Sequence, residues 1–146
     1  MPGIVVGVDG SGHSQRALEW AMHEAALRHA ALNVLYVHPA IVGYYGGVVT
    51  AEQDLELTEQ TQAAVKAEAD KVLAALDGPH PESVTVRAVH GFPVEELVSA
   101  SKDADMVVLG SRGVGGFTRM LLGSTAGQVV QHAHCPVLII PPEDRG

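Results

Sequence analysis

The chain has 146 residues, a formal net charge of −8 at pH 7 and hydrophobic side chains at 47% of its positions. This length suits one α/β domain, residues 1–146, and is too short for two domains of ordinary size. With only 9 Lys and Arg residues, a nucleic-acid binder is not expected, because binding to backbone phosphates needs a concentrated basic surface. A small ligand or a protein partner fits this composition better.

No apolar run is long enough for a membrane helix, and the N-terminus enters a strand-like GIVVGV without a basic region or a cleavage site. We therefore expect a soluble cytoplasmic protein without a membrane partner. The single cysteine, Cys135, cannot form an internal disulfide, which is compatible with a reducing compartment. We expect Cys135 to be a small packed residue and not a reactive thiol.

Short apolar runs rich in β-branched residues indicate strands that are buried on both faces of a parallel sheet. In chain order they are GIVVGV at 3–8, LNVLYV at 32–37, VTVRAV at 84–89, DMVVLG at 105–110 and PVLII at 136–140. Their composition predicts five strands.

Segments with a helical spacing of apolar residues lie between these runs. The third of these expected helices, residues 93–102, is the shortest. We expect Ser14 to cap the first helix, and Gly78 with Pro79 to end the second. The apolar positions of the other helices are Leu18, Ala21, Met22 and Ala25, then Val65, Ala69, Val72 and Leu76, and finally Ala126, Val129, Val130 and Ala133.

The alternation βαβαβαβαβ predicts a doubly wound α/β fold with five parallel strands in the order 3-2-1-4-5 and helices on both faces. Ligands of open α/β sheets bind beyond the carboxyl ends of the strands, where the winding reverses. Here the reversal falls between strands 1 and 4. The loops that leave these strands, beginning at Asp9 and Gly110, are therefore expected side by side.

The loop after the fourth strand, GSRGVGGFTRMLLGST at 110–125, matches neither the GxGxxG nor the Walker A pattern. Its glycines nevertheless allow close approach of the backbone to a ligand, and its end coincides with a helix start, where unpaired N–H groups suit phosphate. Ser124 and Thr125 add hydroxyl donors, and Arg112 and Arg119 add positive charge. The pattern alone leaves open that Ser124 only caps the helix and that the glycines only form a bend.

Asp9 ends the first strand at the same crevice. A carboxylate accepts hydrogen bonds from sugar hydroxyls or an amino-bearing base but repels phosphate, which suggests a nucleoside end opposite the phosphate end. The alternative is that Asp9 only shapes the turn Asp9-Gly10-Ser11-Gly12.

The loop also resembles the nucleotide-binding branch of the universal stress protein family, whose pattern is G-x2-G-x9-G-[ST]. Here it reads Gly110, Gly113, Gly123 and Ser124. The stretch VGVDGS at the first strand, a valine closing the second strand and PVLII near the end extend the resemblance over essentially the whole chain. It implies the same sheet order, with ATP held by its base near the first two strand ends and by its phosphates on the loop.

Carried over residue by residue, the resemblance implies that Asp9 holds the ribose or base side and that Val37 holds the adenine. Arg119 is added here as a physically expected further phosphate partner. The loop contacts implied by the resemblance are Gly110, Ser111, Arg112, Gly113, Gly123, Ser124 and Thr125.

We therefore expect an ATP-binding stress-response or signalling protein in which nucleotide occupancy changes the surface offered to a downstream partner. No general base for a hydrolytic water stands out among the acids, so efficient catalysis is not expected, although ATP bound with Mg²⁺ could hydrolyse slowly. Alternatives are a slow ATPase or adenylyl-handling enzyme, and a sensor of AMP or cyclic AMP. The latter stays open because the loop specifies phosphate more clearly than the number of phosphates.

The strand at 136–140 occupies a sheet edge in the predicted order, and an exposed apolar edge tends to pair. Because the family pairs this strand with its symmetry mate, the resemblance implies a homodimer through Pro136 to Ile140. No metal site is expected from the 8 histidines, since ligation needs convergent geometry. The long connection at 38–51 is either a lid or partner-binding loop, or a loop packed on its own domain.

Overall fold

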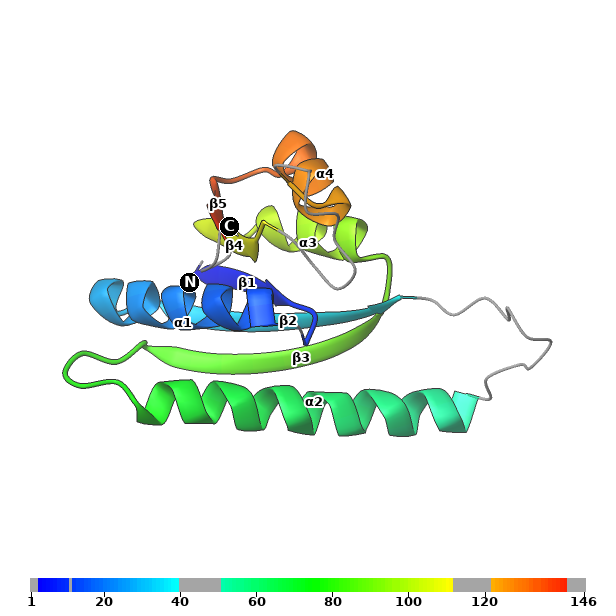
Figure 1. The fold of residues 1–146 in the computed structure, drawn as a ribbon, viewed down its shortest axis with the longest axis horizontal. Coiled ribbons are helices and arrows are strands. Elements are labelled where there is room, and N and C mark those ends of the chain that lie inside the picture. Colours follow the sequence, from blue (N-terminus) through cyan, green and yellow to red (C-terminus); the bar gives the residue numbers. More distant parts are fainter. Residues whose placement is uncertain (1–2, 11, 40–50, 112–121, 142–146) are drawn as a thin grey trace.

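The computed structural model describes residues 3–10, 12–39, 51–111 and 122–141, and shows strands alternating with helices along the chain (Figure 1). Each element expected from the sequence is present and has the expected type. The elements are β1 Ile4–Val8, α1 Gly12–Arg28, β2 Ala31–Pro39, α2 Ala51–Ala74, β3 Ser83–Gly91, α3 Pro93–Ser101, β4 Met106–Gly110, α4 Ser124–His132 and β5 Val137–Ile140.

The strands form one parallel sheet in the order β3-β2-β1-β4-β5. β1 occupies its centre, and Val6 of β1 lies in register with Val34 of β2 and Val108 of β4. The predicted doubly wound α/β fold with strand order 3-2-1-4-5 is thereby confirmed. The winding reverses between β1 and β4, as expected.

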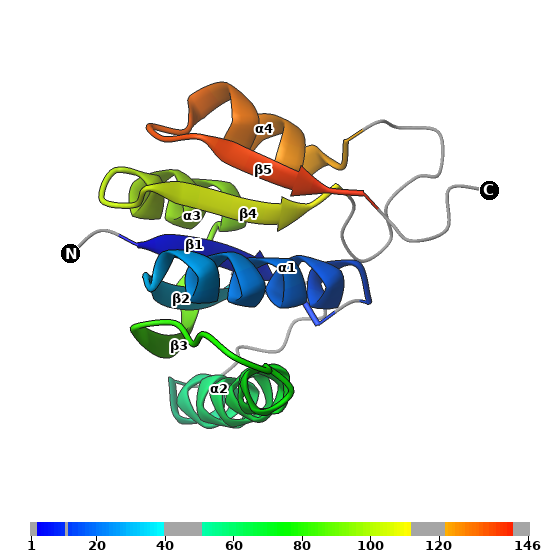
Figure 2. The ribbon, with the colours of Figure 1, turned by 90° about the vertical axis from the view of Figure 1, so that its left-hand side faces the viewer.

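Helices cover both faces of this sheet, so the central strands β1 and β4 have no polar side. The expectation that 84–89 is buried on both faces is wrong, because β3 is an edge strand on which Thr85 and Arg87 are exposed. Successive strand residues point to opposite faces. Val6 belongs to a buried cluster with Leu18 and Met22 of α1, to which α2 also contributes, whereas the adjacent Val5 belongs to a cluster with residues of α3 and α4, such as Leu97. Figure 2 shows α1 in front of the sheet and α3 and α4 behind it.

Two element boundaries differ from the sequence-based expectation. α2 ends at Ala74, before Gly78. The N–H groups of Ala75 and Leu76 each donate 3.2 Å bonds to the carbonyl three residues earlier, a tighter turn that ends the helix before Gly78 adopts its positive φ of 100°. β2 continues to Pro39, because its pairing with β3 runs that far.

The hydroxyl of Ser101 fixes the approach to β5. Ser101, at the end of α3, is only 1% exposed. Its Oγ donates a 2.6 Å hydrogen bond to the carbonyl of Val98 and accepts a 2.9 Å bond from the backbone N–H of His134, in the turn between α4 and β5. One buried side chain thus ties the C-terminal part of the sheet to α3.

Replacing Ser101 by Ala should lower the free energy of unfolding by about 0.5–1.5 kcal/mol, because the part-buried hydrogen bond from the N–H of His134 to Oγ of Ser101 is lost. Urea unfolding of the purified variant measures this change. Ser99→Ala is the matched control, since Ser99 lies on the same helix but is exposed. An equal effect of the two substitutions would contradict the role given to Ser101.

Candidate functional site

The ends of β1 and β4 lie side by side at the carboxyl edge of the sheet. The two strands pair in parallel, with Val5 beside Val107 and Val6 beside Val108. Asp9 follows β1 directly, and Ser111 follows β4 directly. The topology thus brings together the strand ends from which the two loops leave, as the sequence predicted.

Ser111 joins the end of β4 to the start of α4 through its backbone. Its N–H donates a 3.0 Å hydrogen bond to the carbonyl of Ile140, at the end of β5, and its carbonyl accepts a bond from the N–H of Gly123. Ser111 is buried, with 5% of its surface exposed. The two ends of the 110–125 loop are therefore held together, although twelve positions separate Gly123 from Ser111 in the sequence.

The first turn of α4 carries backbone donors at this end of the sheet. Gly123 is the N-cap residue, with an extended backbone of φ −65° and ψ 167°, and no side chain that the structure describes caps this helix. The first helical bond runs from the N–H of Gly127 to the carbonyl of Gly123, so the N–H groups of Ser124, Thr125 and Ala126 precede the helical ladder. This arrangement matches the oxygens of a phosphate.

The alternative reading of Ser124 as a helix cap is therefore wrong. Ser124 is the first residue of α4, and the N-cap position belongs to Gly123. Gly123 has no side chain to occupy these N–H groups, so within the described residues they are left for another acceptor. Ser124 is exposed and Thr125 is half-buried.

Asp9 is half-buried at the end of β1 and is anchored by α1. Its backbone N–H donates a 3.2 Å hydrogen bond to Oγ of Ser14, and Gly10 follows with a left-handed φ of 84°. The expectation that Ser14 caps α1 is wrong, because α1 already begins at Gly12. Ser14 instead holds the turn that carries Asp9.

Val37 lies next to this turn, on the neighbouring strand. Val8 of β1 is in register with Tyr36 of β2, so Asp9 and Val37, one position further along each strand, are neighbours at the sheet edge. The side chain of Val37 packs with Val89 and the other apolar residues of the α3 and α4 face. Asp9, Val37 and the start of α4 thus border the carboxyl edge of the sheet together.

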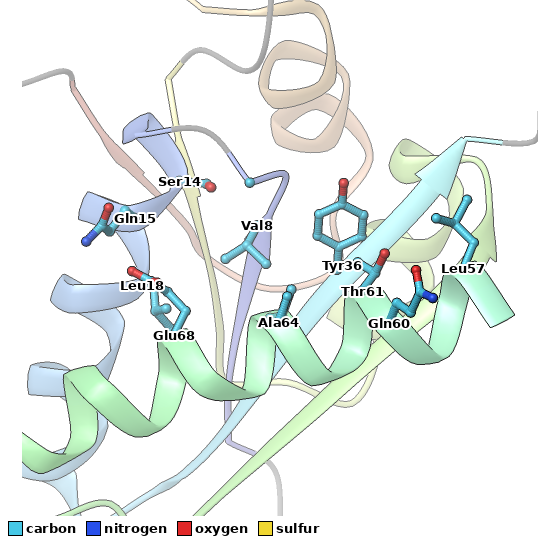
Figure 3. Close-up of a pocket in the computed structure, with 12 residues that line it drawn as sticks. Val8, Ser14, Gln15, Leu18, Tyr36, Leu57, Gln60, Thr61, Ala64 and Glu68 are labelled. Atoms are coloured by element: carbon cyan, nitrogen blue, oxygen red, sulfur yellow. The ribbon is translucent and has the colours of Figure 1, made fainter.

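A cavity of about 430 Å³ opens beside Asp9, between α1 and α2. Figure 3 shows side chains of α2, among them Leu57, Thr61 and Ala64, facing Val8 of β1 and Tyr36 of β2. Sequence analysis missed this cavity. The available signal was the small size of Thr61 and Ala64 on the inner side of the second helix.

Arg16, near this end of the sheet, was also missed by sequence analysis. Its Nη1 donates a 2.7 Å hydrogen bond to the carbonyl of Pro141, just after β5. The bond joins α1 to the same strand end that Ser111 holds through Ile140. Arg16 therefore braces the edge of the sheet next to the crevice.

The model of the universal stress protein family matches residues 2–141. The chain belongs to this family. A universal stress protein of Mycobacterium tuberculosis is 38% identical to it over 155 residues, which cover 98% of this chain and 49% of the relative. The chain covers 48–49% of the length of the curated relatives it matches and thus spans about half of them.

Solved universal stress proteins have the same fold. The structure of UspA from Lactobacillus plantarum superposes with a TM-score of 0.74 at 26% identity, covering 95% of this chain and 97% of that one. A universal stress protein in complex with cAMP gives a TM-score of 0.68 at 25% identity, with 96% of each chain covered. One from Archaeoglobus fulgidus in complex with dAMP gives 0.58 at 27% identity, covering 96% of this chain and 98% of that one.

Part of the site expected for a universal stress protein falls outside the described residues. Arg112, Gly113 and Arg119 lie there, as does most of the 38–51 connection with Tyr44 and Tyr45. The described members of the expected site are Asp9, Val37, Gly110, Ser111, Gly123, Ser124 and Thr125.

Metal and thiol chemistry find little support in the described part of this universal stress protein. Within it, no group of three or more His, Cys, Asp and Glu side chains is arranged to hold a metal ion. Cys135 is half-buried. Burial, and to a smaller extent the charge of Asp105, raise the pKa of its thiol against the lowering effect of a backbone hydrogen bond at Val107, so the thiol stays protonated at neutral pH.

None of the described helices is both long and apolar enough to cross a membrane.

The turn after β1 should depend on the glycine at position 10. Gly10→Ala should lower the free energy of unfolding by about 1–2 kcal/mol, because a side chain disfavours the left-handed backbone that Gly10 adopts. Urea unfolding measures the loss. Gly12→Ala is the control, since an added Cβ there meets nothing within 4 Å, and it should leave stability unchanged or raise it. Equal stability of the two variants would count against this account of the turn.

Proposed function

We propose that this chain binds an adenine nucleotide in the crevice between the ends of β1 and β4, with ATP accompanied by Mg²⁺ as the preferred ligand. The observation that carries the proposal is the open first turn of α4 beside Ser111, where backbone N–H groups and a positive helix end are offered to phosphate oxygens. Hydroxyl groups of Ser124 and Thr125 add donors. Gly110, Arg112, Gly113 and Arg119 complete the proposed phosphate side.

The opposite side of the crevice suits the nucleoside. Asp9 supplies a carboxylate that accepts hydrogen bonds from ribose hydroxyls or an exocyclic amino group, and it follows β1, whereas the start of α4 is tied to the end of the neighbouring β4. Val37, at the end of β2, offers an apolar edge to the adenine ring, next to Asp9 across the strand pair. The polarity of the ligand, base toward β2 and phosphates toward α4, follows from this placement.

The solved relatives support adenine nucleotides as the ligand class, since one is in complex with cAMP and another with dAMP. Their ligands carry a single phosphate group. A sensor of AMP or cyclic AMP is therefore the second candidate, and titration of ATP, AMP and cyclic AMP against the same preparation ranks the three.

We propose that nucleotide occupancy changes the conformation of the loops at the crevice and thereby the surface offered to a downstream protein in the cytoplasm, with residues 1–146 acting as one nucleotide-binding domain. In this proposal Ser124 and Thr125 provide hydrogen-bond donors, and Asp9 lies on the nucleoside side. Because none of these groups is assigned as a general base for water, we expect ATP to be bound without efficient turnover. Brisk hydrolysis that depends on a single site would instead favour the ATPase or adenylyl-handling alternative.

Ser124→Asp should separate phosphate binding from stability. A carboxylate in the first turn of α4 repels a phosphate but interacts favourably with the helix dipole, so the fold should keep or gain stability. We expect ATP to bind at least about tenfold more weakly, equivalent to about 1.4 kcal/mol. Isothermal titration with Mg²⁺-ATP measures the affinity, and urea unfolding measures the stability.

Gln128→Glu is the matched control, because Gln128 is exposed on α4 one turn further from the helix start. It adds the same charge and should bind ATP as the unmodified chain does. Wild-type affinity of Ser124→Asp, or an equal loss in both variants, would refute the proposed phosphate site.

We further propose a homodimer in which the segment Pro136 to Ile140 pairs with its symmetry mate. Among the described strands β5 stands at the edge of the sheet and pairs with β4 alone, on its inner side. Its residues before Ile140 are only half-buried, although all are apolar, and an edge of this kind favours pairing with a second strand. Light scattering at micromolar concentration should give twice the mass of the 15.3 kDa chain. A monomer mass would contradict the dimer.

A further inference from the structure

We propose that the cavity between α1 and α2 is a second ligand site, which takes a small aromatic amine and is separate from the nucleotide crevice. The cavity measures about 430 Å³, within the range of roughly 300–1,000 Å³ found for small-molecule sites. It is lined by α1, α2 and the ends of β1 and β2.

The cavity exists because α2 changes character along its length. Toward its C-terminal end, Val72, Leu73 and, just beyond it, Leu76 pack against the core of the α1 and α2 face. Two to three turns before Val72, the positions that line the cavity carry Thr61 and Ala64, whose small side chains lie opposite Val8 and Tyr36 (Figure 3). Larger side chains thus fill the space toward the C-terminal end of α2, and the space next to Thr61 and Ala64 is left open.

The cavity and the proposed nucleotide site lie on different sides of the sheet. Tyr36 and Val8 line the cavity on the face covered by α1 and α2. Val37, the next residue of β2, packs with the residues of α3 and α4, and the helix start proposed to hold phosphates belongs to α4. A ligand in the cavity and a nucleotide in the crevice would thus be separated by the end of β2.

The lining selects against anions. Apolar surface comes from Val8, Leu18, Leu57 and the ring of Tyr36, which suits a flat aromatic body. Among the described lining residues there is no Lys, Arg or His, and the one acid is Glu68. Among these residues a phosphate or carboxylate would meet no cation, whereas an ammonium group would meet the Glu68 carboxylate.

Glu68 lies at the end of the stripe that α2 turns toward the cavity. Leu57, Thr61, Ala64 and Glu68 recur at intervals of three and four residues, so they share one side of the helix. Glu68 is half-buried. Solvent and ions therefore screen its attraction to a bound ammonium group less than they would for a fully exposed acid. The stripe thus places an apolar surface next to a negative charge, as an aromatic amine requires.

Three probes with one ring system and different charges test this chemistry. Tryptamine, indole and indole-3-acetate are titrated into the full chain, with binding followed by isothermal titration and by methyl chemical shifts. We expect tryptamine to bind about threefold or more tightly than indole, as a partly exposed ion pair provides, and indole-3-acetate to bind most weakly. Equal binding of all three, or preference for the acetate, would overturn the proposal.

Paired variants on α2 locate the site. Ala64 and Ala67 are both exposed, but only Ala64 is among the residues that line the cavity. Ala64→Trp should therefore fill the cavity and weaken tryptamine binding by at least about tenfold, whereas Ala67→Trp should leave it unchanged. Glu68→Gln should reduce tryptamine to the affinity of indole, and Glu59→Gln, at another exposed position of α2, should not. Equal effects within either pair would overturn the assignment.

The fold of each variant is checked by urea unfolding. If Ala64→Trp fails to fold, methyl shifts of the unmodified chain decide the location. Shifts on adding tryptamine that concentrate at Val8, Leu57 and Val65 support the site, and their absence from these residues overturns it. No step of this test uses a nucleotide, so its outcome is independent of the proposed nucleotide site.

Discussion

The parallel pairing of β1 with β4 is the constraint on which the other features of this molecule depend. Because β2 lies on one side of β1 and β4 on the other, right-handed crossovers must place α1 and α2 on one face and α3 and α4 on the opposite face. The two loops that leave the central strands are then neighbours. The backbone of Ser111 adds the local detail by linking the end of β5 to the residue before α4. The crevice is thus a product of topology first and of particular side chains second.

The fold was predictable because its information is local and redundant. Continuous β-branched runs indicated strands of a parallel sheet, and their alternation with helical segments left few topologies. The exposed side of β3 was not indicated, because it follows from the place of that strand at the sheet edge. The boundaries were less accessible, since they depend on single hydrogen bonds. α2 ended in a tight turn before Gly78, and α1 closes with His29 in the left-handed region at φ 50°, where a glycine would have been the usual signal.

The candidate site was predictable only where topology determines it. The proximity of Asp9 to the loop after β4 follows from strand order alone. The role of Ser14 as an anchor for Asp9 and that of Ser111 as a bridge depend on contacts between distant segments, which no local pattern encodes. The cavity was hidden for a different reason. It results from volume that Thr61 and Ala64 do not fill, and a sequence shows the side chains that are present more readily than the space between two helices.

The alternation of side chains along β2 has a mechanical consequence. Tyr36 and Val37 are consecutive residues, yet one lines the cavity and the other packs toward α3 and α4. A displacement of this short backbone segment would move a residue that lines the cavity and a residue of the α3 and α4 face together. Thermodynamic linkage requires that two occupants sensing the same segment influence each other's affinity equally. The end of β2 therefore links the face covered by α1 and α2 directly to the face covered by α3 and α4.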